Sequence, residues 1–175
     1  MRYGTRSLSA RYWTPAGVRP CGSMNIGYKY GYLYTAVCPA TGDLFALMLP
    51  SMQSECFKVF LERFQQHLQQ HYPEQLNTTP TRPTSVRLVL DNAGAHHADV
   101  LAEQSSISLE FLPAYSPELN PVERFFQELR RATKPYVFET LEQIEQVLTE
   151  TLHRYWDNPK ALVQLTYWDW MTAPP

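Results

Sequence analysis

Residues Leu88–His97 read LVLDNAGAHH, a branched apolar run that ends in an aspartate and is followed at once by turn residues and two histidines. An apolar run of this length bounded by turn residues predicts a short buried strand over residues 86–91. Asp91 then stands at the C-terminal end of that strand, which is where open α/β sheets place ligand and metal chemistry. An ordinary polar turn begins in the same way, so Asp91 alone leaves both interpretations open.

The residues before this strand predict a hairpin and a helix. Two aromatic and aliphatic runs, 28–37 and 44–50, are joined by CPATGD, which places Gly42 and Asp43 in a β-turn. Helical spacing of apolar residues follows from Phe57 onward, with Ser54 as the expected N-cap. Nearer the N-terminus, a Gly-, Pro- and Arg-rich stretch predicts loop with one short strand near residues 10–14.

The residues after Asp91 predict one more strand and then helices. HADVLAEQ (97–104) could form a short helix, and ISLEFLP (107–113) predicts a strand. Helices are expected over residues 121–133 and 140–157, the second beginning with a capping box of Thr140 and Gln143, and a short one over 159–171. Hairpin, helix, strand, helix, strand and then helices indicate a mixed α/β layer fold.

Composition bounds the class of protein. The chain has 175 residues, of which 44% are hydrophobic and 18% charged, as expected for one soluble globular domain. It has no stretch of about 20 apolar residues and no apolar secretory core near its start. Its three cysteines stand alone, so they predict neither a disulfide framework nor a zinc site. We therefore expect a reduced, cytosolic protein.

The charge is distributed unevenly. The net charge is −2, yet residues 1–42 carry five basic residues and no acid. Such asymmetry is a known hint of an arm that faces a polyanion. A solvated loop that happens to lack acids is equally compatible with the charge alone.

A second carboxylate stands out in the segment ELNPVERF. Asn120 is expected as the N-cap and Pro121 as the first helical residue, which places Glu123 in the first turn. One carboxylate from a strand end and one from a helix start would suit Mg²⁺, which prefers hard oxygen ligands and keeps much of its water. Two such ions can activate a nucleophile and stabilise a leaving oxygen.

Each of these residues also has an ordinary structural explanation. Glu123 can reach back to the backbone N–H of Asn120 as a capping-box partner. Asp91 can begin an Asx-turn. His96 and His97 can assist with phosphate or metal, or can simply lie at the surface near a helix start.

The C-terminal aromatic residues have two possible roles. They can form a platform on which bases stack, although their helical context favours packing. They are Tyr155, Trp156, Tyr167, Trp168 and Trp170.

Two motifs together point to a family. LVLDNAGAHH and ISLEFLPAYSPELNPVERFFQELRR, with 31 residues between Asp91 and Glu123, resemble the catalytic half of mariner-superfamily insertion-sequence transposases. In that family a strand ends in Asp-Asn, and a Leu-Pro-x-Tyr-Ser-Pro-x-Leu-Asn-Pro-x-Glu segment supplies the last acid. RYWTPAGVRP and YGYLYTAVCPATGDLFALMLP also resemble the family's earlier region, so the resemblance covers nearly the whole chain.

The resemblance implies a fold and a reaction. It implies an α/β fold with a ribonuclease H-like mixed sheet flanked by helices, and a DDE triad that binds two Mg²⁺ (or Mn²⁺) ions. Such an enzyme cleaves transposon-end DNA and transfers the 3′-OH strand to target DNA. By position, Asp91 is the second acid and Glu123 the third, with Asn92 and Asn120 beside them as supporting residues. A bacterial cytosolic location, on the nucleoid when bound to DNA, is implied as well.

The DNA contacts expected from this resemblance combine the basic N-terminal arm with the helix that follows Glu123. The residues are Arg2, Arg6, Arg11, Arg124, Arg130, Arg131 and Lys134. Transposon-end and target DNA are the implied partners, and no membrane is.

The chain also departs from the family pattern. The family's first acid, in an Asp-Glu pair at the end of the first strand, precedes the segment with which this chain opens, and Asp43 in a hairpin turn is a poor substitute. We expect residues 1–175 to be a partial DDE catalytic domain without the central first strand and the N-terminal helix-turn-helix region. Such a chain should be inactive alone, and oligomeric or poorly soluble unless an upstream fragment supplies the strand.

Two other functions remain compatible with the sequence. One is a catalytically inactive remnant that binds DNA or a full-length transposase. The other is a different ribonuclease H-like nuclease that takes its missing acid from Glu55, Asp99 or Glu118, although none of these is expected at a strand end.

Overall fold

The structure is a computed structural model that describes residues 1–6, 13–19, 21, 23–73, 86–91, 107–168 and 171. Its strands form a three-stranded antiparallel sheet and a two-stranded parallel one: β1 (Arg2–Arg6), β2 (Ile26–Val37) and β3 (Leu44–Leu49) in the first, β4 (Val86–Leu90) and β5 (Ile107–Phe111) in the second. The helical elements are α1 (Ser54–His71), the 3₁₀ turn η3 (Pro117–Leu119), α3 (Val122–Thr133), α4 (Leu141–Trp156) and α5 (Pro159–Thr166).

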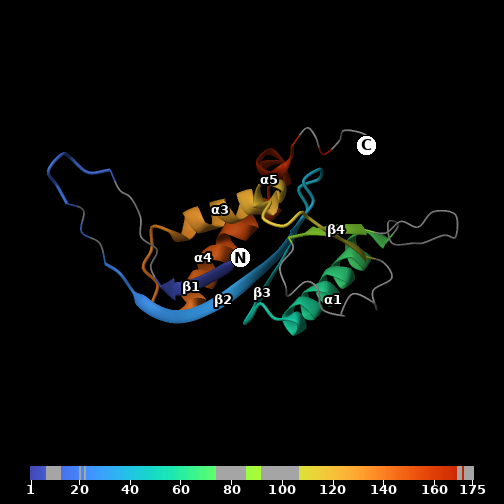
Figure 1. Ribbon diagram of the computed structural model, residues 1–175, viewed down its shortest axis with the longest axis horizontal. Helices are drawn as coiled ribbons and strands as arrows, with labels where there is room; N and C mark the ends of the chain where they lie inside the picture. Colours follow the sequence, from blue (N-terminus) through green and yellow to red (C-terminus); the bar gives the residue numbers. More distant parts are fainter. Residues whose placement is uncertain are drawn as a thin grey trace.

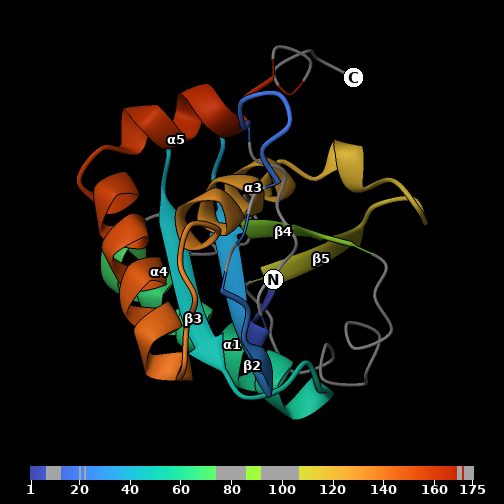
Figure 2. The same ribbon diagram turned by 90° about the vertical axis from the view of Figure 1, so that its left-hand side faces the viewer.

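The β2–β3 hairpin forms the middle layer, with α3, α4 and α5 on one side and α1 on the other (Figure 1, Figure 2). Successive side chains of a strand point to opposite faces. Leu33 therefore packs against buried residues of α3, α4 and α5, whereas Ala36 packs against α1. This arrangement of strands between layers of helices confirms the predicted α/β class.

Helix α1 forms because its apolar residues repeat at helical spacing. The phenylalanines at 57, 60 and 64 and the leucines at 61 and 68 are all buried, and their side chains cover one face of the hairpin. The predicted N-cap was wrong by one residue. Ser54 is the first helical residue, Gln53 precedes it in extended conformation, and neither side chain caps the helix.

Strand β4 is less buried than the sequence predicts. Leu88 faces the α1 cluster and is buried, and Val86 and Leu90 pack against the same cluster. Val89 points to the other face and is 46% exposed, and Arg87 is exposed beside it. An apolar run shows that a segment is a strand, but it does not show whether both faces are covered.

The remaining element predictions divide into three groups. The capping box at Thr140 and Gln143 is confirmed. A strand lies at residues 2–6, whereas the strand predicted near 10–14 falls mostly outside the described residues, and residues 13 and 14 are not in a strand. Helix α5 ends at Thr166, short of the predicted end, because Tyr167 is extended. The possible helix at 97–104 lies outside the described residues. Separately, none of the described helices is long and apolar enough to cross a membrane.

One edge of β2 is only partly paired in the described part of the chain. The Met1 amine donates to Leu33 O at 2.6 Å, and Leu33 N donates to Met1 O at 2.8 Å. Beyond Leu33, residues 34–37 pair with β3 on one side, and no described strand pairs with them on the other. No described strand joins β2 to β4.

We predict that Gly42→Ala destabilises the fold more than Gly17→Ala. Both glycines have positive φ, +79° and +83°, so both variants carry a backbone penalty of at most about 1–2 kcal/mol. A Cβ at Gly42 would also lie 2.2 Å from the carbonyl oxygen of Pro159, where the hairpin turn meets α5, whereas one at Gly17 meets nothing within 4 Å. Overpacking should add about 1–3 kcal/mol. Urea unfolding of the two variants measures the difference, and equal losses would contradict this contact.

Candidate metal and nucleic-acid site

Asp91 follows β4 directly and is exposed. The parallel ladder continues to the residue before it, because Leu112 N donates to Leu90 O at 2.8 Å. Asp91 therefore lies at the C-terminal edge of the parallel strand pair, where sheets of this kind place their ligands. The alternative Asx-turn involves residues outside the described part of the chain.

Glu123 lies in the first turn of α3, at a helix start that Asn120 organises. Asn120 Oδ1 accepts from Val122 N at 3.2 Å, and the Asn120 carbonyl accepts from Glu123 N at 3.1 Å. Pro121 is already helical, with φ −61°, so Asn120 acts as the predicted cap although the assigned helix begins one residue later.

The carboxylate of Glu123 does not form the alternative capping box. The backbone N–H of Asn120 donates to Pro117 O at 3.1 Å. Glu123 Oε2 lies instead 3.6 Å from Arg130 Nη1, two helical turns further along α3. Because the Glu123 carboxylate does not cap the helix, it can interact with a positively charged group.

The Met1 amine lies in the neighbourhood of both acids. Burial lowers its pKa to about 6, and the charges of Glu123, Arg130 and Asp91 act on it as well. The two carboxylates raise this pKa and Arg130 lowers it. The charges of Asp91 and Glu123 therefore both reach the Met1 amine, which precedes β1.

The donor set of this region fits a hard divalent cation in part. Asp91 and Glu123 supply carboxylate oxygens, the ligand type that Mg²⁺ and Mn²⁺ prefer. Among the described residues, no group of three His, Cys, Asp or Glu side chains could hold a metal ion. Asn92 and the two histidines that follow lie outside the described residues, as does Asp99.

The other acids considered as a third ligand stand elsewhere in the chain. Glu55 lies in the first turn of α1, and Glu118 is an exposed residue of η3. Neither follows a strand, as the sequence predicted.

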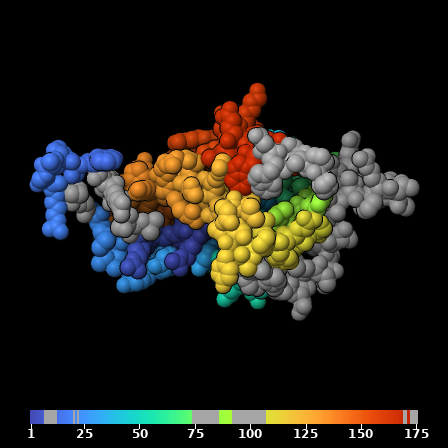
Figure 3. Space-filling view, turned by 45° about the horizontal axis from the view of Figure 1, so that its top comes forward, coloured from blue at the N-terminus to red at the C-terminus, as the bar shows by residue number. Residues whose placement is uncertain are grey.

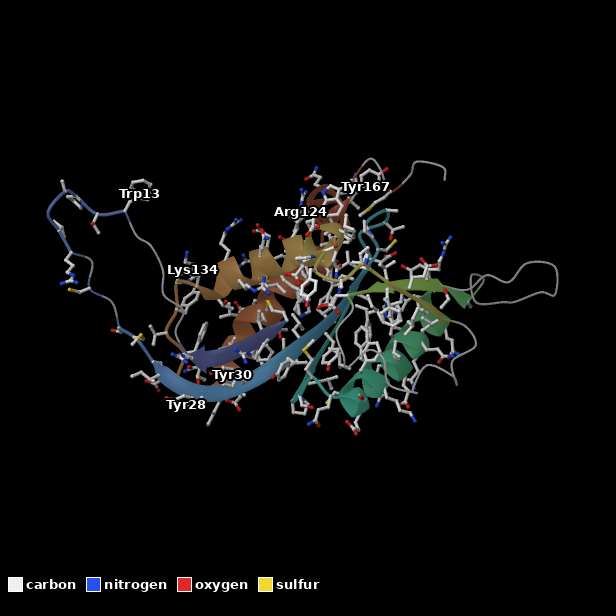
Figure 4. All side chains as sticks on the ribbon, viewed as in Figure 1. Trp13, Tyr28, Tyr30, Arg124, Lys134 and Tyr167 are labelled. Atoms are coloured by element: carbon white, nitrogen blue, oxygen red, sulfur yellow. The ribbon has the colours of Figure 1, made fainter. Side chains whose placement is uncertain are left out.

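A basic face runs along α3 from its first turn to its end. Arg124 and Lys134 mark the two ends of this face (Figure 4), and at 1.5 Å per residue they are about 15 Å apart along the axis. All four cations of this face are exposed: Arg124, Arg130, Arg131 and Lys134. Arg130 pairs with Glu123 and Arg131 with Glu128. Such surface pairs contribute little stability, so the guanidinium groups can exchange them for phosphate oxygens.

The basic N-terminal arm carries exposed aromatic rings. The Arg2 guanidinium lies 4.7 Å from the centroid of the Tyr30 ring, and Arg6 is exposed at the end of β1. Trp13, from the loop before β2, and Tyr28, from β2 itself, project into solvent (Figure 4). Arg11, the remaining predicted DNA contact, lies outside the described residues.

The C-terminal aromatic residues mostly pack. Tyr155 contacts Phe125 edge to face at 5.0 Å between ring centroids, and Trp156 Nε1 donates to Leu44 O at 2.7 Å. The Trp168 ring lies 4.7 Å from the Arg124 guanidinium, so Trp168 contacts the basic face of α3. Trp170 lies outside the described residues.

Two features of the site carry no signal in the sequence. One is the Met1 amine, whose position follows from its pairing with β2. The other is Tyr115, a residue with φ 60° in the loop between β5 and η3. The segment AYSPELNP predicts a loop, but not which residue takes the left-handed conformation.

Comparison with known proteins agrees with this geometry. A family model described as DDE superfamily endonuclease matches residues 2–145. An uncharacterized protein of Sinorhizobium fredii (strain NBRC 101917 / NGR234), y4pE/y4sA, is 36% identical over 101 residues, which make up 58% of this chain and 66% of that protein.

Two solved structures share the fold. One is the Mos1 mariner paired end complex with Mn, with a TM-score of 0.64 and 20% identity over 89% of this chain and 48% of that chain. The other is the Mos1 transposase paired-end complex with left transposon end, with a TM-score of 0.64 and 19% identity over 94% of this chain and 50% of that chain. The chain thus spans about half the length of the solved proteins that it matches.

We predict that Asn120→Ala lowers the free energy of unfolding by about 1 kcal/mol, because the N–H of Val122 loses its side-chain acceptor. Asn120→Asp keeps an acceptor at the same place and should cost only a few tenths of a kcal/mol. Chemical denaturation of the three proteins measures this difference. Equal stability of Asn120→Ala and the parent chain would mean that Asn120 does not organise the start of α3.

Proposed function

Because the chain belongs to the DDE superfamily endonuclease family, we propose that it is the catalytic-core part of a DNA transposase. The observation that carries this proposal is the placement of the two motif acids, Asp91 directly after β4 and Glu123 in the first turn of α3, with both charges acting on the Met1 amine. The complete enzyme would cleave transposon-end DNA and transfer the 3′-OH strand to target DNA. The paired-end complexes of Mos1, to which this fold is similar, support DNA as the partner.

The metal proposed for this site is Mg²⁺ or Mn²⁺, held by Asp91 and Glu123. When bound, two such ions supply activation of the attacking oxygen and stabilisation of the leaving one. Asn120 fixes the start of α3 and so orients Glu123 toward the site. Arg130 holds the Glu123 carboxylate by charge, and Asn92 would support Asp91 in the same way that Asn120 supports Glu123.

The basic residues would bind the DNA backbone. The exposed face of α3 carries Arg124, Arg130, Arg131 and Lys134, and the arm carries Arg2, Arg6 and Arg11. Phosphate contacts of this kind position a duplex without reading its sequence. Their contribution to affinity falls as salt rises, because each neutralised phosphate releases counterions.

We further propose that residues 1–175 form a partial DDE domain and that a strand bearing the first acid completes it. This strand would lie against the uncovered edge of β2 and would reach the site beside Met1, in line with β1. A longer form of the chain, an upstream fragment or a second copy would supply the strand, and the chain alone should be inactive.

A second candidate function needs no third acid. Among the described residues, no group of three His, Cys, Asp or Glu side chains could hold a metal ion, which suits a non-catalytic protein that binds DNA or a full-length transposase. DNA binding without any Mg²⁺-dependent nicking, even after the missing strand is supplied, would favour this function.

We predict that Asp91→Asn or Glu123→Gln abolishes DNA cleavage and strand transfer by the completed enzyme. Removing a metal ligand forfeits several kcal/mol of transition-state stabilisation, so the rate should fall more than about 100-fold. Affinity for DNA should stay within about threefold, because the basic face is intact. Glu150→Gln, an exposed acid on α4, serves as the control. Rates that survive either site substitution would exclude that residue as a ligand.

The proposed strand position predicts an alternating pattern of hydrogen exchange along β2. Leu33 pairs with Met1, so the backbone groups of Thr35 and Val37 face the same uncovered edge, whereas those of Tyr34 and Ala36 face β3. In the isolated chain, the amides of the first pair should exchange at least about tenfold faster than those of the second.

Addition of the strand should then slow the exchange of Thr35 and Val37 and leave Tyr34 and Ala36 unchanged. Amide exchange measured by NMR resolves the individual residues. Uniform protection of all four amides in a monomer would contradict the uncovered edge, and protection that depends on protein concentration would identify a second copy as the occupant.

A further inference from the structure

We propose that the Tyr115 ring is a stacking platform for a base of the DNA strand that enters the site, an inference that rests on the proposed function. Tyr115 lies in the loop between β5 and η3, which leaves the body on the side away from α4 and α5 (Figure 2). The segment from β5 to η3, in yellow, lies at the surface of the molecule (Figure 3). Three observations carry the proposal: backbone strain, complete exposure and position.

The backbone of Tyr115 is strained. Its φ is 60°, and among the described residues no other non-glycine residue has a positive φ. Two prolines confine the reversal of the chain to Ala114 and Tyr115, because Pro113 precedes the turn and Pro117 begins η3. A left-handed position of this kind normally selects glycine or asparagine, and a bulky residue there is a genuine outlier. Strain of this kind tends to gather at functional sites.

The side chain of Tyr115 gains nothing from the fold to offset that strain. Its relative exposure is 101%, so both faces of the ring are open to solvent. In the described part of the chain, it has no hydrogen bond and no ring contact. A smaller polar residue would make the same turn with less strain and less exposed apolar surface. The ring is therefore best explained by a ligand outside the chain.

The position of Tyr115 defines the class of ligand. Leu90 pairs with Phe111, so Leu112 is level with Asp91 in the parallel register. The Cα atoms of Asp91 and Leu112 are separated by one strand spacing, and Tyr115 is three residues beyond Leu112. The Tyr115 Cα therefore lies no more than about 16 Å from the Asp91 Cα. This upper limit corresponds to about five nucleotide steps of duplex rise. A flat, neutral and open aromatic ring at that distance suits an unpaired base, because every base has a face on which a ring can stack.

The test is a binding titration of the full chain with two fluorescein-labelled DNAs. One is a blunt 20-bp duplex, and the other is the same duplex with a five-nucleotide dT tail. Tyr115→Ala should weaken binding of the tailed DNA about 5- to 140-fold and leave the blunt duplex within twofold. The slope of log Kd against log salt should not change, because a neutral ring releases no counterions. Tyr115→Phe should bind the tailed DNA as the parent does.

Two further variants separate stacking from folding. Tyr115→Gly removes the ring but relieves the strain, so it should melt no lower than the parent and still lose the preference for the tail. Tyr136→Ala is the matched control, because Tyr136 is 57% exposed after α3 and packs on Phe138. That variant should bind both DNAs as the parent does.

Each of the other outcomes overturns the inference in a recognisable way. If the parent binds both DNAs and Tyr115→Ala does not change the tail preference, the stacking role is wrong and the proposed function stands. If Tyr115→Ala changes the sedimentation coefficient but not DNA binding, the ring contacts a second copy instead. If the parent chain, with the missing strand supplied, binds neither DNA, both the stacking role and the proposed function are wrong.

Discussion

The β2–β3 hairpin is the constraint on which the rest of the structure depends. Both of its faces are buried, with Leu33 against α3, α4 and α5 and Ala36 against α1. A strand pair covered on both faces fixes its register, because a slip of one residue would exchange every side chain between the two cores. The hairpin therefore sets the height at which β1 pairs, and through β1 it sets the position of Met1. The charges of Asp91 and Glu123 both act on the Met1 amine.

Packing fixes the element that carries Glu123 more firmly than the element that carries Asp91. Glu123 belongs to α3, whose Phe125 and Leu129 are fully buried in the first core, so its backbone is fixed by packing. Asp91 belongs to the end of β4, which has one buried face and one exposed face. Packing therefore orients Glu123 more firmly than Asp91. A cation between the two carboxylates, or a strand beside β4, would supply the restraint that β4 lacks.

The elements that the sequence predicted well are those with local physical signals. The apolar period of α1, the capping box at Thr140 and the turn at Gly42 each depend on residues close together in the chain, and each is found where it was expected. The order of Asp91 and Glu123 in two specific motifs pointed to the family for the same reason. The Asn120 cap was also predictable, because a cap is recognised from its own residue and the next three.

The features that sequence could not give depend on tertiary context. The exposed face of β4 follows from what packs against that strand, and the strand at residues 2–6 from its pairing with β2. Arg130 pairs with Glu123 because α3 brings them to one face, and Tyr115 is strained because two prolines restrict its loop.

The central claim is that Asp91 and Glu123 share one cation, and paramagnetic broadening by Mn²⁺ tests it most directly. Substoichiometric Mn²⁺ should broaden the amide signals at the end of β4 and at the start of α3 together, along with that of Leu33, and Asp91→Asn should reduce all three effects. Broadening at one carboxylate that leaves the other sharp would contradict the account.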